Sequence, residues 1–476
     1  MSNAKNTLTT PLSFHLGAFG LFLPALLFSA ASIVLFACQR VFDLSALAAA
    51  AFVSLALGAL LCKTPTRYWE AAVRSAASPL TASVLMLLLA GGVFSALMKA
   101  SGLAAALAGL AGGFFTGSGI VLVGIFLTCA LLATATGSSI STILTAAPVF
   151  LPAAAALGVD PSAASGAILS GAIFGDNLSP VSDVAIISAM TQTESDGSPA
   201  ELGAVVASRA PLALAALIVA LPLFLLHDGE LSAEAAASEF DAASLLMLIP
   251  VALLILLAVR TRNALFAMTA ASLAAAAIGL ASGIYTPQDL FRTSNSGAEG
   301  ALVDGIRSVS GLMLMLLSLL SLTGILEASN LAEAFAEKLK RTSGGSLASE
   351  TLIAAASLLF TALFAAVTSV SAAAAGTLSN RLCRQSVDAC RRANLVAGFA
   401  NSLPVLLPFS AFMLITASAA EAALGAGSVQ GVEIAKSAYY PAALFLVLTA
   451  SIVCRAIRSR RSALASELHP TETSHA

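Results

Sequence analysis

Charged residues are scarce in this chain of 476 residues, because Asp, Glu, Lys and Arg together make up only 10% of it. Soluble domains carry roughly 25% charged residues. Hydrophobic residues make up 58%, and the mean hydropathy is +0.94. This composition excludes a soluble globular domain. The formal net charge is −2, and no basic stretch is interleaved with aromatic residues, so the sequence predicts no nucleic-acid partner.

Cysteine is sparse as well, and its spacing is not that of a metal centre or a disulfide framework. No two cysteines form a C-x-x-C pair; the six are Cys38, Cys62, Cys129, Cys383, Cys390 and Cys454. The sequence therefore predicts neither a cysteine-held metal nor a bound cofactor.

Long apolar runs, in contrast, recur along the whole chain. A run of about 20 apolar residues is long enough to span ~30 Å of hydrocarbon as a helix. Ten such runs occupy residues 14–37, 44–61, 80–98, 120–135, 202–226, 245–259, 264–281, 309–326, 351–367 and 438–453. We therefore predict an all-α polytopic protein with about 10–12 transmembrane segments in the lipid bilayer. The first run is too long for the apolar core of a cleaved signal, and no A-x-A site follows it.

Basic residues between the runs predict the orientation, because they accumulate on the cytoplasmic side of a membrane. The basic clusters are Lys63, Arg67 and Arg74; Arg260 and Arg262; Lys338, Lys340 and Arg341; Arg381, Arg384, Arg391 and Arg392; and Arg455, Arg458, Arg460 and Arg461. Residues 227–241 contain acidic residues but no Lys or Arg, so this segment is expected outside. We predict a multi-pass protein of the inner cell membrane with both termini in the cytoplasm.

If both termini lie on one side and the midpoint on the other, each half crosses the membrane an odd number of times. Such halves have opposite orientation, which is the inverted repeat of many secondary transporters. Three short pairs recur in the same order: residues 100–104 with 328–332, 136–139 with 368–371, and 177–181 with 401–405. We predict a first repeat over residues 1–226, an external linker over 227–242, a second repeat over 243–461 and a cytoplasmic tail over 462–476.

Helix-breaking residues interrupt the apolar sequence in both halves. Pro148 and Pro152 are expected to interrupt one piece. Because proline disfavours helix at the residue before it, we expect one helix to end near Gly175 and another to begin at Pro180, with Ser179 as its N-cap. Broken helices expose carbonyl groups that lipid cannot satisfy. We expect residues 136–139 and 175–180 to be non-helical neighbours, with 368–371 and 401–404 opposite them. Residues 331–341 are expected to form an amphipathic interfacial helix.

Two aspartates, Asp176 and Asp183, lie within this apolar sequence. A carboxylate at membrane depth costs several kcal/mol unless it has a partner. The two are about 10 Å apart on an unbroken helix and closer across a break, which suits one Na⁺ or one exchangeable proton. The alternative is that either carboxylate only satisfies a helix N-terminus.

The candidate ion- or substrate-binding residues are Asp176, Asp183, Asn177, Ser179, Ser182, Thr136, Gly137, Ser138, Ser139, Thr368, Ser371, Asn401 and Ser402, with Asp176 and Asp183 as the Na⁺ ligands. For the hydroxyl residues, the alternative is a role as small residues in close helix packing. Lys99 and Arg209 lie near the ends of runs, and we expect both to snorkel to the membrane surface. No catalytic residue is predicted.

The motifs Thr136-Gly-Ser-Ser139 and Gly171-Ala-Ile-Phe-Gly-Asp176-Asn-Leu-Ser-Pro180-Val-Ser-Asp183 closely resemble the NhaC-type Na⁺/H⁺ antiporter family of the ion transporter superfamily. That family carries T-G-S-S-W followed by S-G-A-x-F-G-D-K-x-S-P-L-S-D-T-T. The resemblance implies a secondary transporter with broken or re-entrant helices. This chain has Asn177 where the family has Lys and Ile140 where it has Trp. Residues 391–398 lack the acidic pair of the family's second half.

The resemblance implies exchange of Na⁺ for protons, both as transported or coupling ions. The alternative is Na⁺- or H⁺-coupled transport of a small organic solute, an organic acid or amino acid. A channel is a weaker alternative, because paired acids that titrate suit exchange better. A membrane aspartyl protease is disfavoured, because Ile173 occupies the first glycine of the G-x-G-D signature. We therefore predict a non-enzyme, and the sequence leaves open whether it forms a homodimer.

Overall fold

The computed structural model describes residues 11–35, 44–103, 106, 117–194, 197–198, 200–227, 242–261, 263–294, 297–330, 345–425 and 427–468. The predicted amphipathic segment 331–341, nearly all of the predicted linker 227–242 and the end of the predicted tail lie outside the described residues.

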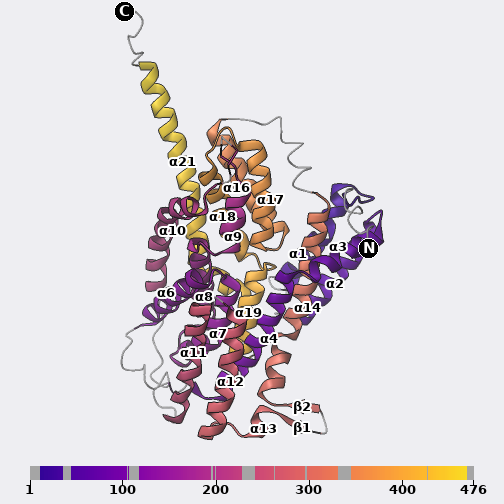
Figure 1. Ribbon diagram of the computed structural model, residues 1–476, viewed down its shortest axis with the longest axis vertical. Coiled ribbons are helices and arrows are strands. Elements are labelled where there is room, and N and C mark those ends of the chain that lie inside the picture. Colours follow the sequence, from indigo (N-terminus) through magenta and orange to yellow (C-terminus); the bar gives the residue numbers. More distant parts are fainter. Residues whose placement is uncertain are drawn as a thin grey trace, which may run out of the picture.

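Helices make up most of the described chain (Figure 1). In the first half they are α1 (Ala18–Ile33), α2 (Leu44–Leu61), α3 (Pro65–Ala76), α4 (Pro79–Ala100), α6 (Ser118–Thr136), α7 (Ser139–Ala156), α8 (Pro161–Leu178), α9 (Asp183–Met190) and α10 (Leu202–Leu225). In the second half they are η3 (Ala242–Met247), α11 (Leu248–Thr261), α12 (Ala264–Ser282), α13 (Pro287–Leu290), α14 (Ala301–Ala328), α16 (Ser346–Leu363), α17 (Thr368–Cys383), α18 (Ala389–Ala400), η5 (Leu403–Leu406), α19 (Ala411–Leu424), α20 (Gly431–Ser437) and α21 (Tyr439–Leu468). A short antiparallel hairpin joins β1 (Arg292–Ser294) to β2 (Gly297–Glu299).

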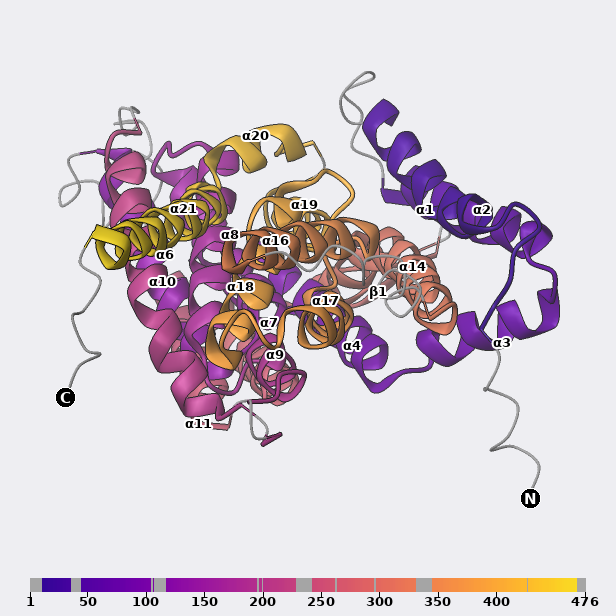
Figure 2. The ribbon, with the colours of Figure 1, turned by 90° about the horizontal axis from the view of Figure 1, so that it is seen from above.

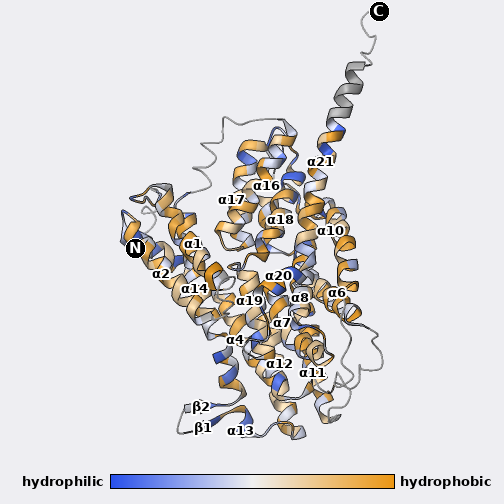
Figure 3. Ribbon diagram, turned by 180° about the vertical axis from the view of Figure 1, so that it is seen from behind, coloured by the Kyte–Doolittle hydropathy of each residue, from blue (hydrophilic) through white to orange (hydrophobic). Residues whose placement is uncertain are grey.

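The described helices have the length and composition of membrane spans. Nine are long and apolar enough to cross a bilayer, and a tenth span results if the bent pair Ala389–Leu406 and Ala411–Leu424 counts as one. Large apolar side chains such as Leu131 and Ile218 are exposed, as expected where lipid replaces water. Figure 3 shows that hydrophobic residues recur along most of the helices. The prediction of an all-α polytopic membrane protein is confirmed.

The prediction that Pro148 and Pro152 interrupt the chain is wrong, because α7 continues through both residues. Neighbouring helices and local adjustments satisfy the carbonyl groups that a proline frees within a membrane helix. α10 tolerates two prolines, Pro211 and Pro222, in the same way.

The break between α8 and α9 lies about one helical turn later than expected. α8 runs through Gly175 to Leu178, and the Ser179 N–H still donates to the Gly175 carbonyl oxygen at 2.9 Å. Pro180 then ends the helix. The N-cap of α9 is Ser182, whose side chain accepts from the Ala185 N–H, so Ser179 is not the cap. Asp176 therefore lies in the last turn of a helix and Asp183 in the first turn of the next.

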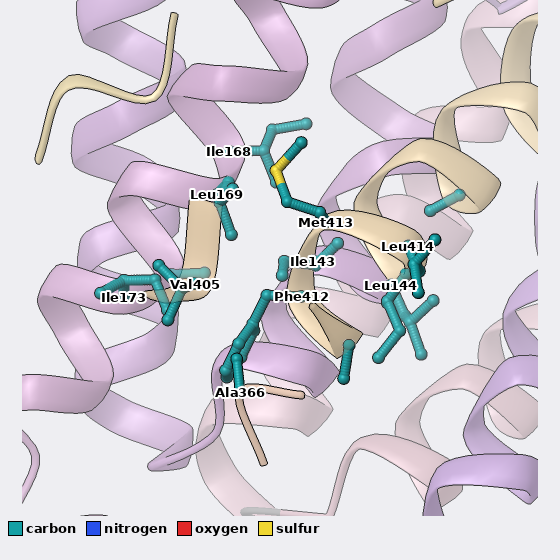
Figure 4. Packing of buried hydrophobic residues seen from close by; sticks show 14 of the residues in the cluster. Ile143, Leu144, Ile168, Leu169, Ile173, Ala366, Val405, Phe412, Met413 and Leu414 are labelled. Carbon is teal, nitrogen blue, oxygen red and sulfur yellow. The ribbon is translucent and has the colours of Figure 1, made fainter. Parts of the chain in front are cut away.

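α8 forms the centre of the molecule, and its residues 162–177 are all buried. Glycines allow α6 to approach it closely: a Cβ atom added at Gly171 would lie 2.3 Å from the Phe126 carbonyl oxygen, and one at Gly175 would lie 2.3 Å from that of Ala130. Figure 4 shows apolar side chains of α7, α8, η5 and α19 in the same buried cluster. The site residues on α8 are thus held by a tightly packed core.

The two halves of the chain are interleaved. α9 packs against α17 and α18, while α19 packs against α4 and α7. Seen from above, α1, α2 and α3 lie on the opposite side of the molecule from α6, α10 and α21 (Figure 2). A break after α6 and one after α8 are matched in order by breaks after α16 and after α18. This order agrees with two repeats, and their inverted relation stays a prediction.

We expect Gly171→Ala to lower the free energy of unfolding by about 1–3 kcal/mol, because the new methyl group would collide with the backbone of α6. Gly124→Ala on α6 is the matched control, since a Cβ atom there meets nothing within 4 Å. Thermal unfolding of the purified protein in detergent measures both changes. Equal unfolding midpoints for the two variants would contradict the close approach of α6 and α8.

Candidate ion-binding site

A cavity of about 400 Å³ lies where three helix breaks meet. The breaks are those between α6 and α7, α8 and α9, and α16 and α17, and the walls are completed by α4, α14 and the start of α19. Its lining residues are Pro79, Ser83, Val84, Leu87, Gly137, Ser138, Ser139, Ile140, Asp176, Asp183, Val184, Leu316, Leu320, Ala366, Val367, Thr368, Ser369, Ala411, Phe412 and Ile415.

The first break is made by Gly137 and Ser138. Gly137 ends α6 in the left-handed conformation, with φ 72°, which glycine adopts without strain. A Cβ atom there would lie 2.7 Å from the Val181 side chain, so this break touches the turn between α8 and α9. The Ser138 side chain caps α7 by accepting from the Ser141 N–H at 3.3 Å. The two motifs singled out in the sequence are therefore in contact.

The second break carries both aspartates. Asp176 is 5% exposed, and its Oδ2 accepts a hydrogen bond from Ser139 Oγ at 2.8 Å. Because Ser139 begins α7, the carboxylate lies close to a helix N-terminus, whose partial positive charge favours an anion. Asp183, the first residue of α9, is exposed and lines the same cavity. One carboxylate is thus buried in the wall and the other is open to the cavity.

The third break lies at residues 364–367, directly before Thr368. Ala365 and Ala366 both have positive φ, 49° and 60°, which is uncommon for residues with a Cβ atom. Such residues cost of order 1–3 kcal/mol each and often occur at functional sites. The Ala365 carbonyl oxygen accepts from the Ala411 N–H at 2.8 Å, which ties this break to the start of α19. Thr368 is already the first residue of α17.

The structure brings together six of the thirteen candidate residues on the cavity wall: Gly137, Ser138, Ser139, Asp176, Asp183 and Thr368. The other seven do not line it. Three hydroxyl groups donate to nearby backbone carbonyl oxygens: that of Thr136 to Leu132, that of Ser371 to Val367, and that of Ser402 to Phe399. Asn177 in the last turn of α8, and Ser179 and Ser182 in the α8–α9 break, are not lining residues, although the Ser182 side chain hydrogen-bonds to Asp176. Asn401 is fully buried, and neither its Oδ1 nor its Nδ2 has a partner.

Arg209 was not expected at the site, and its predicted snorkelling is wrong. This residue of α10 is only 2% exposed and donates three hydrogen bonds within the protein. The only signal in the sequence was its isolation as a charge within an apolar run, which by itself favours a functional role. Lys99, in contrast, is exposed at the end of α4, as expected.

A second cavity of about 510 Å³ lies next to the first, and Leu320 of α14 lines both. Its wall is more polar, because α3 contributes Arg67, Glu70 and Arg74 and α14 contributes Glu327. Ser78, Thr81 and Thr323 also line the second cavity, and Ser78 directly precedes Pro79 of the first cavity. Polar side chains therefore extend from the site toward α3.

Residues 4–201 match the model of the Na⁺/H⁺ antiporter family. This range contains α7, α8 and α9, with both aspartates. The match covers less than half of the chain. A 57-residue stretch is 44% identical to the Na(+)/H(+) antiporter NhaC of Alkalihalophilus pseudofirmus and covers 12% of each chain. The resemblance to NhaC-type antiporters predicted from the motifs is confirmed over this part of the chain.

We expect Ser139→Ala to destabilise the protein by about 1–3 kcal/mol, because it removes the hydrogen bond to a buried carboxylate. Thr128→Ala on α6 is the control, since its hydroxyl is exposed and bonds only within its own helix. Urea unfolding in detergent, followed by circular dichroism, compares the two. A Ser139→Ala variant as stable as Thr128→Ala would show that the contact does not hold Asp176.

Proposed function

We propose that the protein is a secondary active transporter that exchanges Na⁺ for protons across the membrane. The observation that carries the proposal is the burial of Asp176 in the wall of a cavity. An ionised carboxylate in a medium of low dielectric constant is unfavourable unless a cation compensates it. Asp176 is therefore stable with either a proton or Na⁺ bound, and competition between the two couples their movements.

The residues around Asp176 fit a hard monovalent cation. Oxygen atoms are the ligands that such cations prefer. The Ser139 hydroxyl donates to the carboxylate, and the hydroxyl residues Thr368 and Ser369 line the same cavity. Asp183 adds a second carboxylate that is open to the cavity, where it attracts cations and raises their local concentration.

The second cavity is our proposed route between the site and one side of the membrane. Its Glu70 and Glu327 attract cations, and its hydroxyl groups replace part of their hydration. We assign this side to the cytoplasm, because Arg67 and Arg74 on α3 belong to a basic cluster. With the termini also in the cytoplasm, the two halves of the chain have opposite orientation, and Asp176 belongs to the first of two inverted repeats.

We expect Na⁺ to dissipate a preformed pH gradient in proteoliposomes that contain the protein. Asp176→Asn keeps the shape of the side chain and removes the exchangeable charge, so coupled transport should be abolished while the protein remains folded and inserted. Asp183→Asn is the matched control. Because this residue is exposed, its loss should lower the rate and raise the apparent KM for Na⁺ without abolishing exchange.

Comparison of Na⁺, Li⁺ and K⁺ in this assay gives the cation selectivity, and size-exclusion chromatography confirms that each variant is folded. Full Na⁺-driven proton movement by Asp176→Asn would refute the proposal. Loss of exchange in Asp183→Asn with retention in Asp176→Asn would reverse the roles of the two carboxylates.

Na⁺ should also stabilise the protein against thermal unfolding, because a ligand that binds only the folded state stabilises it by mass action. At a concentration of about 100 times the dissociation constant, the gain is about 2.7 kcal/mol. Replacing choline chloride by NaCl at constant ionic strength should raise the unfolding midpoint of the wild type and leave that of Asp176→Asn unchanged. The same rise in both proteins would mean that Na⁺ binds elsewhere.

A further inference from the structure

We infer that the first cavity, which carries Asp176, also binds organic cations that have an apolar chain, and that these cations compete there with Na⁺. The inference deepens the proposed exchange function, on which the competition with Na⁺ rests, by naming a second class of ligand for the same site. Its support is the size of the cavity, the sign of its charges and the separation of its charged groups from its apolar wall.

The cavity is much larger than a monovalent cation requires. Its volume is about 400 Å³, whereas one water molecule occupies roughly 30 Å³ in the liquid. Pockets for small organic molecules typically measure about 300–1,000 Å³ and have mostly apolar walls with a few polar groups. A bare Na⁺ leaves most of this volume to other occupants, and the cavity has the dimensions of a pocket for an organic ligand.

Three helices form an apolar part of the wall. The residues are Val84 and Leu87 of α4, Leu316 and Leu320 of α14, and Phe412 and Ile415 of α19. Water is a poor occupant beside such a surface, because a buried water needs about two to four polar partners. An apolar group gains free energy when the same surface removes it from water. This part of the wall therefore favours a hydrocarbon chain.

The charged residues of the cavity are all acidic. Asp176 lies in the last turn of α8 and Asp183 at the start of α9, and no Lys, Arg or His is among the described residues that line the cavity. In the described chain, α4, α14 and α19 contribute no charged residue to this wall. The second cavity differs, because Arg67 and Arg74 line it together with its acidic residues. Negative charge and apolar surface thus come from different helices of the first cavity.

An organic cation with an apolar chain matches both parts of the wall. Its charged group compensates the carboxylates, which are unfavourable at low dielectric constant without a cation, while its chain covers the apolar helices. An organic anion fits less well. The N-terminus of α17 begins at Thr368 in the wall and favours an anion, but such an anion would share the cavity with two carboxylates that repel it. A neutral compound would leave both carboxylates uncompensated.

Alkyltrimethylammonium ions are suitable probes, because they carry a fixed charge and no exchangeable proton. In proteoliposomes at constant pH, hexyltrimethylammonium should raise the apparent KM for Na⁺ and leave the maximal rate of Na⁺-driven proton movement unchanged. Choline, which has the same charged group but no apolar chain, should raise the apparent KM far less. Between butyltrimethylammonium and hexyltrimethylammonium, each methylene group should tighten binding about fourfold. Hexanesulfonate, with the opposite charge on the same chain, should not compete.

Leu316→Ala tests the apolar wall directly, and Leu314→Ala is its matched control. Both residues belong to α14, but Leu316 lines the cavity, whereas Leu314 is 61% exposed and does not line it. Leu316→Ala should weaken competition by hexyltrimethylammonium about tenfold and reduce the difference between the butyl and hexyl probes. Leu314→Ala should behave like the wild type. If Leu316→Ala does not fold, the chain-length series in the wild type decides the question.

Thermal unfolding in detergent measures binding independently of transport. Hexyltrimethylammonium chloride should raise the unfolding midpoint of the wild type above its value in choline chloride at the same ionic strength, because the ligand binds only the folded state. If this rise occurs in a protein that shows no Na⁺-driven proton movement, the proposed exchange fails while the inferred binding of organic cations stands.

Competition that does not depend on chain length would overturn the inference, as would equal competition by hexanesulfonate. Equal weakening in Leu316→Ala and Leu314→Ala would show that the probes act through the lipid or detergent, which also contradicts it. Normal Na⁺-driven proton movement that no alkyltrimethylammonium ion affects would overturn the inference and leave the proposed exchange intact.

Discussion

The contact between Ser139 and Asp176 is the interaction on which the rest of the site depends. It brings the first turn of α7 to the last turn of α8, and it is possible only because α6 ends at Gly137 and lets the chain turn. Glycines on α8 then allow the backbones of α6 and α8 to approach each other closely. A single buried carboxylate thus requires a broken helix, a hydroxyl donor and a close-packed glycine face, and all three occur in this protein.

Each of the three helix breaks at the cavity has a different physical cause. Gly137 adopts positive φ at no steric cost, Pro180 stops α8 by removing an N–H donor, and Ala365 and Ala366 accept a strained conformation. The strain at the alanines is maintained by the bond between the Ala365 carbonyl group and α19. α19 also packs against α7, the helix that begins at Ser139.

The sequence predicted the features that depend on local composition. Apolar runs identified most of the spans, and the cluster around Asp176 and Pro180 identified the break. Its boundary shifted to Leu178 because a helix continues until its hydrogen bonds fail, and Pro180 removes an N–H donor only after Ser179 has closed its own bond. Pro148 misled the prediction, because packing by neighbouring helices outweighed the local preference of proline.

Features that depend on tertiary contacts could not be predicted. Nothing in the letters Phe-Ala-Ala-Val marks a break at residues 364–367, since alanine normally favours helix. Arg209 lies close to a run end in the sequence, and only its three partners on α8, α9 and α18 reveal that it points inward. Asn401 matched Asn177 in the sequence pattern, but it does not line the cavity.

Proton release on Na⁺ binding tests the central claim most directly, because it asks whether the two ions compete for one carboxylate. Calorimetric titration of the detergent-solubilised protein with NaCl, repeated in buffers of different ionisation enthalpy, counts the protons released. The competition predicts about half a proton released per Na⁺ bound at the pH at which Asp176 is half protonated, about one at more acid pH, and none at strongly alkaline pH. Saturable Na⁺ binding without proton release at any pH would contradict it.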